Sequence, residues 1–63
     1  MDEITPSRIR ATRLERGLTL REASEQVGVT LNTFARWERG ERDPSRGPRL
    51  VVAALSAWLE DRG

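Results

Sequence analysis

The apolar residues of the chain fall into four short stretches, and within each stretch they recur about three or four residues apart, as on one side of an α-helix. Glycine and proline residues stand between the stretches and mark where helices end. The pattern predicts an all-α chain with helices over residues 6–16, 20–27, 31–39 and 49–60. No linker, internal repeat or low-complexity segment interrupts it, so residues 1–63 are predicted to form one domain.

The first predicted helix carries a strong start signal. Thr5 is expected to cap it, and Pro6 suits its first position, where a backbone N–H has no helical partner in any case. Ile4 is expected to pack onto Ile9, one turn into the helix. Ile9 and Leu14 are expected to face the core.

The second predicted helix leads into a tight turn. Thr19 and Glu22 are spaced as a capping box at its start, and Gly28 is expected to end it. Only residues 28–30 then separate it from the third helix, with Val29 expected to be buried in the turn. Two short helices joined by such a glycine-containing turn form a helix-turn-helix unit, here residues 19–39. The tight connection directs the outer face of the third helix toward solvent.

The third predicted helix has two faces of different chemistry. Thr30 is expected to cap it, and Gly40 is expected to end it in a left-handed conformation. Phe34 and Trp37 lie three residues apart on one face, which is predicted to be buried. The other face carries an apolar tip, an amide, a methyl group and two guanidinium groups, from Leu31, Asn32, Ala35, Arg36 and Arg39. Such a face is typical of helices that read base edges in a DNA groove.

Several side chains of this helix have a matching partner on DNA. Arg36 can donate two hydrogen bonds to guanine, Asn32 can pair with adenine, and Leu31 can contact a thymine methyl group. Arg39 and Arg42 lie near the helix end and in the following loop, where they are better placed for phosphates. Two simpler interpretations stay open: Leu31 as a partly buried packing residue, and Arg36 as a solvated charge without a partner.

The C-terminal segment 48–60, in which Pro48 precedes the last predicted helix, is apolar around most of its circumference. Its apolar residues form three stripes: Val51, Leu55 and Trp58; Leu50, Ala54 and Ala57; and Val52 and Leu59. A helix of this kind needs cover on more than one side, and three short helices are expected to cover only one. A second copy of the chain is therefore expected to form a homodimer against Val52, Leu55 and Leu59. Alternatively, Val52 and Leu59 are simply exposed.

The charge of the chain is unevenly spread. The formal net charge is +1, and all eleven basic residues are arginine. Ten of them lie between Arg8 and Arg49 against six acidic residues, which leaves +4 in this middle part. A positive region suits a nucleic-acid partner, but the same charges are equally consistent with an ordinary solvated helical surface.

Composition argues against several other classes of protein. Without cysteine or histidine, the chain can form neither a disulfide nor a Cys/His zinc site. It has no glycine-rich phosphate loop and no carboxylate pair suited to acid–base catalysis, so we expect no enzyme activity, no metal and no cofactor. The longest apolar run, Leu50–Leu55, is far too short to span a bilayer. We therefore expect a cytoplasmic protein without a membrane partner.

Three groups of residues resemble those of a known family: Gly17-Leu18-Thr19, Gly28-Val29-Thr30, and the run from Trp37 to Ser45 that begins Trp-Glu-Arg-Gly. Over residues 8–45 the chain resembles the phage repressor/Cro (XRE-type) helix-turn-helix family. The resemblance implies a small lambda-repressor-like domain of four or five helices. The family's usual fifth helix is expected to be missing, since the segment after Pro48 has the pattern of one continuous helix. The resemblance also implies that the third helix lies in the major groove of double-stranded DNA.

The resemblance further implies roles for single residues. It assigns base contacts to Leu31, Asn32 and Arg36. It assigns contacts with the DNA backbone to the starts of the second and third helices, at Thr19, Arg21, Thr30 and Thr33, although Thr33 could instead be a plain surface residue. It also pairs Arg13 with Glu38 in a structural ion pair between the first and third helices.

The chain departs from the family in the second helix. Leu20 stands where the family usually has a glutamine that holds a phosphate, so that contact must come from backbone N–H groups and Arg21, or be absent. Ala23 and Ser24 stand where a Leu-Ala pair is typical. Smaller groups therefore pack there, and Phe34 is expected, with Trp37, to fill the space.

Two functions are compatible with these features. The first is a dimeric, sequence-specific repressor of its own operon, bound to an inverted repeat with half-sites about 34–36 Å apart. The alternative, motivated by the apolar last helix, is a protein-interaction module such as the antitoxin or adaptor component of a two-protein complex, with its partner encoded nearby. The short ending is similar to that of antitoxin-type and anti-CRISPR-associated regulators. In either case we expect a bacterial or phage-encoded, nucleoid-associated protein.

Overall fold

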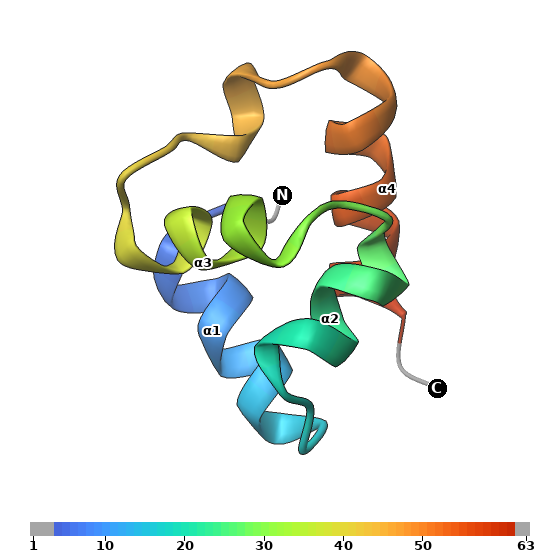
Figure 1. Cartoon of the computed structure of the whole chain (residues 1–63). Helices are drawn as coiled ribbons and strands as arrows, with labels where there is room; N and C mark the ends of the chain where they lie inside the picture. Colours follow the sequence, from blue (N-terminus) through green and yellow to red (C-terminus); the bar gives the residue numbers. More distant parts are fainter. Residues whose placement is uncertain (1–3, 62–63) are drawn as a thin grey trace.

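Helices make up most of the chain in the computed structural model, which describes residues 4–61 (Figure 1). Within that range the elements are four α-helices and one short 3₁₀ helix: α1 (Pro6–Glu15), α2 (Leu20–Val27), α3 (Leu31–Arg39), η1 (Pro44–Arg46) and α4 (Arg49–Glu60). α3 packs against α1 and α2, whereas α4 packs against α2 and η1. The all-α prediction is confirmed, and the described part of the chain contains no strand. Within the same range, no helix has the length and apolar character needed to cross a membrane.

The helix ends follow the local signals in the sequence. Thr5 accepts a hydrogen bond from the backbone N–H of Arg8 at 3.1 Å, as expected of an N-cap. The capping box of α2 is complete, with the Thr19 hydroxyl and the Glu22 carboxylate each accepting from the other's backbone N–H. Gly28 ends α2 at a φ of 92°, which strongly disfavours any residue with a Cβ. The predicted boundaries are thus confirmed, except that α1 ends one residue early, at Glu15.

The core of the domain is built around Phe34, which is fully buried together with Ile9 and Leu55. The Phe34 ring lies 5.7 Å from the ring of Trp37 and 5.6 Å from that of Trp58, the latter in an edge-to-face arrangement. Such aromatic pairs are attractive beyond the area they bury. The three rings come from α3 and α4, so they join the helix-turn-helix unit to the last helix.

The expectation that Leu14 faces the core is wrong, because its side chain is 55% exposed. Leu14 follows Ile9 by five residues, which on a helix places it about 140° around the axis. Ile9 is fully buried, so Leu14 cannot share its face. Thr12 and Arg13, three and four residues after Ile9, take the half-buried positions instead.

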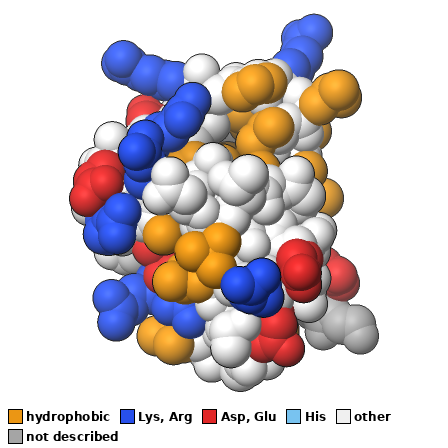
Figure 2. All heavy atoms as spheres, in the orientation of Figure 1, with side chains coloured by type: hydrophobic (Ala, Val, Ile, Leu, Met, Phe, Trp, Pro, Cys, Tyr) orange, Lys and Arg blue, Asp and Glu red, His pale blue; other side chains and the backbone are white. Residues whose placement is uncertain are grey.

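The burial of α4 also differs from the expectation. Leu55 and Leu59, both expected to meet a second copy, are 0% and 7% exposed within one chain. The other helices therefore cover a wider part of α4 than expected, and only Val52 of the predicted interface keeps a partly exposed side. The large apolar side chain of α4 that is exposed is that of Leu50, at 84%. Figure 2 shows hydrophobic side chains gathered at the upper right of the molecule, over the start of α4.

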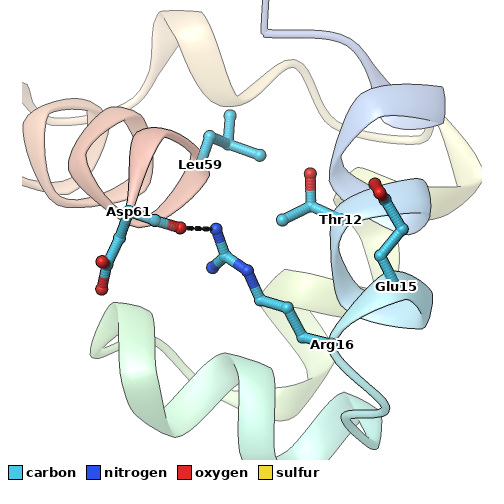
Figure 3. A pocket seen from close by; sticks show the side chains of 5 residues that line it. All are labelled: Thr12, Glu15, Arg16, Leu59 and Asp61. Carbon is cyan, nitrogen blue, oxygen red and sulfur yellow. Dashed lines mark hydrogen bonds between the residues drawn. The ribbon is translucent and has the colours of Figure 1, made fainter. Parts of the chain in front are cut away.

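Arg16 holds the C-terminal end of α4 against the end of α1 (Figure 3). Its guanidinium group donates to the Trp58 carbonyl at 2.8 Å and to the Asp61 carbonyl, and it lies 5.0 Å from the centre of the Trp58 ring. The last carbonyls of a helix have no helical partner and carry partial negative charge, so a cation there is stabilising. The sequence contained no signal for this contact, because Arg16 and Trp58 are far apart along the chain.

The loop after α3 contains one short regular element, the 3₁₀ helix η1. Asp43 caps η1 by accepting from the backbone N–H of Ser45 at 3.0 Å and from its hydroxyl at 2.6 Å. Both hydrogen bonds lower the pKa of the Asp43 carboxyl group, and the one donated by the Ser45 hydroxyl has the larger effect. The loop therefore has a defined shape next to the end of α3.

Replacing Ser45 by alanine is expected to return the pKa of Asp43 toward the usual value for an aspartate. The lowered pKa means that the folded loop binds this proton less readily than the unfolded chain does. The stabilisation of the folded chain by the hydrogen bonds to the Asp43 carboxylate is therefore fully present above the unfolded pKa of about 4. It is lost as the pH falls through the lower pKa of the folded chain. An NMR titration of the carboxyl groups measures the change. Ser7→Ala, on the exposed face of α1, is the control, and an unaltered Asp43 midpoint in Ser45→Ala contradicts the assignment.

Candidate nucleic-acid interface

Helix α3 has one buried face and one exposed face, as predicted. Phe34 and Trp37 are 0% and 2% exposed and hold the helix in the core. Asn32 and Arg36 are exposed, and Leu31 is 40% exposed. The Thr30 cap and the left-handed Gly40 set the length of the helix at nine residues. The helix therefore cannot rotate about its axis without pulling Phe34 and Trp37 out of the core, so its outer face is held in a fixed direction.

Asn32 and Arg36 lie four residues apart, so their side chains are stacked on neighbouring turns of the same face. Within the part of the chain that the structure describes, neither side chain makes a hydrogen bond or an ion pair. Leu31 occupies the first helical position, on the flank of that face. An amide and a guanidinium group without a partner in the described chain thus point outward beside an exposed apolar tip.

The residues expected to contact the DNA backbone surround this face, but their surroundings differ. The Thr30 hydroxyl caps α3 and lies 2.9 Å from the hydroxyl of Thr33, which is half-buried. Thr19 caps α2, and Arg21 is exposed in the first turn of that helix. The free N–H groups at the start of a helix, together with its dipole, favour an anion.

The arginine at the end of α3 and the arginine in the following loop are not equivalent. Arg39 forms an exposed ion pair with Glu41 at 3.0 Å, which offsets part of its charge. Arg42 is exposed and has no ion pair among the described residues. Arg42 is therefore the more available of the two for an external anion.

An ion pair between Arg13 and Glu38 joins α1 to α3, at the positions that the family resemblance implied. Two contacts of 2.6 and 3.0 Å link the guanidinium group to both carboxylate oxygens, and the two side chains are 14% and 8% exposed. The hydrogen bond to Glu38 raises the pKa of Arg13 against the effect of burial. Arg13 also donates to the Leu18 carbonyl at 3.0 Å, so one side chain ties together α1, the following loop and α3.

Helix α2 supports α3 with small side chains. Ala23 is fully buried in the same core cluster as Phe34 and Trp37, so small residues here do accompany large ones in α3. Ser24 is 2% exposed, and its hydroxyl donates to the Arg21 carbonyl at 2.8 Å. Leu20 is half-buried and packs against the core, which makes it a packing residue. Among residues 4–61, no group of acidic side chains could hold a metal ion.

Comparisons with known proteins agree with this geometry. A family model described as helix-turn-helix matches residues 9–47. The chain is also 40% identical over 42 residues to a Haemophilus influenzae protein described as an uncharacterized HTH-type transcriptional regulator. That match covers 60% of this chain but only 18% of the relative's length. No solved structure matches the chain. The chain belongs to the XRE-type helix-turn-helix family.

Proposed function

We propose that this chain is a sequence-specific transcriptional regulator that binds double-stranded DNA by placing α3 in the major groove. The observation that carries the proposal is the outward pair of Asn32 and Arg36, which are free of internal partners on a helix held by buried aromatic rings. A free guanidinium and a free amide at neighbouring turns are suited to base edges. The similarity to a Haemophilus influenzae protein described as a transcriptional regulator supports the same role.

In this proposal the exposed face of α3 reads sequence. The major groove is about 12 Å wide and admits an α-helix. Arg36 pairs with guanine O6 and N7, Asn32 pairs with adenine N6 and N7, and Leu31 packs against a thymine methyl group. The 40% exposure of Leu31 leaves part of its side chain available for that contact.

Contacts with the phosphates set the position of α3 in the groove. They come from the starts of α2 and α3 and from the loop after α3, and such contacts carry little sequence information of their own. Arg42 contributes more charge than Arg39, because Glu41 partly neutralises the latter. The residues assigned to the backbone are Thr19, Arg21, Thr30, Thr33, Arg39 and Arg42.

The finer proposal is a dimeric repressor of its own operon. Two copies on an inverted repeat place their α3 helices one turn of DNA apart, about 34–36 Å. Occupation of a promoter by this domain is enough to block transcription without a catalytic step. Such a protein acts on bacterial or phage DNA in the cytoplasm.

Replacing Arg36 by alanine is expected to weaken binding to a half-site duplex from the region upstream of its own gene by about 2 kcal/mol, or roughly 30-fold, because a bidentate contact with guanine is lost. A mobility-shift titration at fixed salt measures the change, and circular dichroism checks that the exposed substitution leaves the fold intact. Arg10→Ala, which removes an exposed arginine from α1, is the matched control and should have little effect. Equal weakening by both variants would show that only net charge matters and would refute readout by α3.

A further inference from the structure

The outer side of α4 carries an apolar stripe that no other part of the described chain covers. Leu50 is 84% exposed, and Ala53 and Ala57 are also exposed. Leu50 and Ala57 are seven residues apart, about two helical turns, so they lie on the same side of the helix. The stripe thus has one large side chain at its start and small side chains toward its end.

A hollow lies beside the small end of this stripe. It is an open depression with a volume of about 380 Å³, lined by Gln26 of α2, by Ala54, Ala57 and Trp58 of α4, and by Asp61, which follows α4. The Trp58 indole N–H donates to the Gln26 side chain at 2.9 Å, which keeps this wall of the hollow in place. The exposed Leu50 side chain and the hollow beside Ala57 therefore lie on the same helix, about two turns apart.

The flank of the stripe carries opposite charges at its two ends. Arg49 and Glu60 are both exposed. They are eleven residues apart, about three turns, so they lie on the same flank of α4. The start of α4 is therefore positive on this flank and its end is negative.

We propose that a second copy of this chain docks on the stripe, so that two α4 helices pack antiparallel about a two-fold axis. A two-fold interface is self-complementary, because each feature of one copy meets its counterpart on the other. The Leu50 side chain of each copy then enters the hollow of the other. The helices cross at Ala53 and Ala54, whose small side chains allow close approach, and Arg49 of each copy lies beside Glu60 of the other. This inference deepens the proposed function, which places two copies on one operator, and it replaces Leu55 and Leu59 as interface residues.

The arrangement suits two recognition helices on one duplex. In the view of Figure 1, α4 runs along one edge of the molecule and α3 lies nearer its middle. A two-fold axis along the line of sight, just outside that edge, places the two α4 helices antiparallel between the two copies and one α3 helix on either side of them. Each copy measures 26 Å in its two longer dimensions, so two copies side by side extend over more than one turn of DNA.

The test is the mass of the full chain by sedimentation equilibrium from micromolar to millimolar concentration, without DNA. We expect a monomer–dimer equilibrium in the unaltered chain and a dissociation constant roughly 100-fold higher in Leu50→Glu, since each dimer loses two buried leucines. A glutamate in the first turn of a helix does not destabilise it, so the monomer should stay folded. Leu14→Glu, which alters another exposed leucine, is the control and should leave the dissociation constant unchanged.

Charge reversal distinguishes this pairing from nonspecific association of the chain. Arg49→Glu and Glu60→Arg should each raise the dissociation constant roughly 10-fold, and the double variant should restore it, because both ion pairs re-form with reversed sign. A chain that stays monomeric at millimolar concentration, or a dimer unaffected by Leu50→Glu, overturns the inference. If the chain stays monomeric, the partner of the stripe is a different protein. If the chain binds an operator but its dimerisation is unaffected by Leu50→Glu, only this interface is refuted. If Leu50→Glu weakens the dimer but the unaltered chain binds no operator, only the proposed function is refuted.

Discussion

Replacing Glu38 by alanine is expected to destabilise the folded chain by about 3 kcal/mol, near the lower end of the cost of breaking a buried ion pair. The two side chains are 14% and 8% exposed, and both carboxylate oxygens accept from Arg13. Without Glu38, the Arg13 guanidinium keeps only the Leu18 carbonyl among these acceptors while staying largely out of water. In a domain of this size, the loss should lower the thermal midpoint by about 12–24 °C.

The exposed Arg39–Glu41 pair supplies the control for this prediction. Its contact is 3.0 Å, but its side chains are 56% and 54% exposed. Glu41→Ala should therefore cost less than about 1 kcal/mol. Arg13→Ala should cost about as much as Glu38→Ala, and the double variant should cost less than their sum, because both remove the same interaction. A midpoint for Glu38→Ala no lower than that for Glu41→Ala would show that the pair does not lock α3 to α1.

Replacing Phe34 by alanine is expected to cost about 3–5 kcal/mol, the usual range for truncating a buried aromatic side chain. The Phe34 ring is fully buried and contacts the rings of both Trp37 and Trp58, so its removal leaves a cavity between α3 and α4. Folded domains are stable by only about 5–15 kcal/mol, and one this small lies toward the lower end. A large part of the Phe34→Ala population should therefore be unfolded near room temperature.

Tryptophan fluorescence measures this effect directly, since Trp37 and Trp58 are 2% and 6% exposed in the folded chain. Urea titrations of Phe34→Ala should show a much lower midpoint, with emission shifted toward that of solvated indole. Leu31→Ala is the matched control on the same helix, and its 40% exposure predicts a loss below about 1 kcal/mol. If the two variants had similar midpoints, the outer and inner faces of α3 would not differ in the way described.

Much of the candidate interface could be predicted because its signals are local. Thr19, Thr30 and the glycines that end the helices act on backbone groups within a few residues, so the start of α2 and both ends of α3 agree with the prediction. The three-residue spacing of Phe34 and Trp37 likewise determines which side of α3 is buried, and therefore which side carries Asn32 and Arg36. The Arg13–Glu38 pair was expected from the family resemblance, because spacing along the chain does not indicate a contact between α1 and α3.

The sequence by itself determined where the helices lie and which face of the third one is presented to a partner, since capping and helical periodicity depend only on near neighbours. Only the tertiary structure decided which side of α4 is free. Leu50 and Leu55 are both apolar residues of one helix, but they are 84% and 0% exposed because of how α4 packs on its neighbours. The contact of Arg16 with Trp58 was decided in the same way. The burial of an all-round apolar helix depends on the angles at which distant segments meet, and no pattern within the helix specifies those angles.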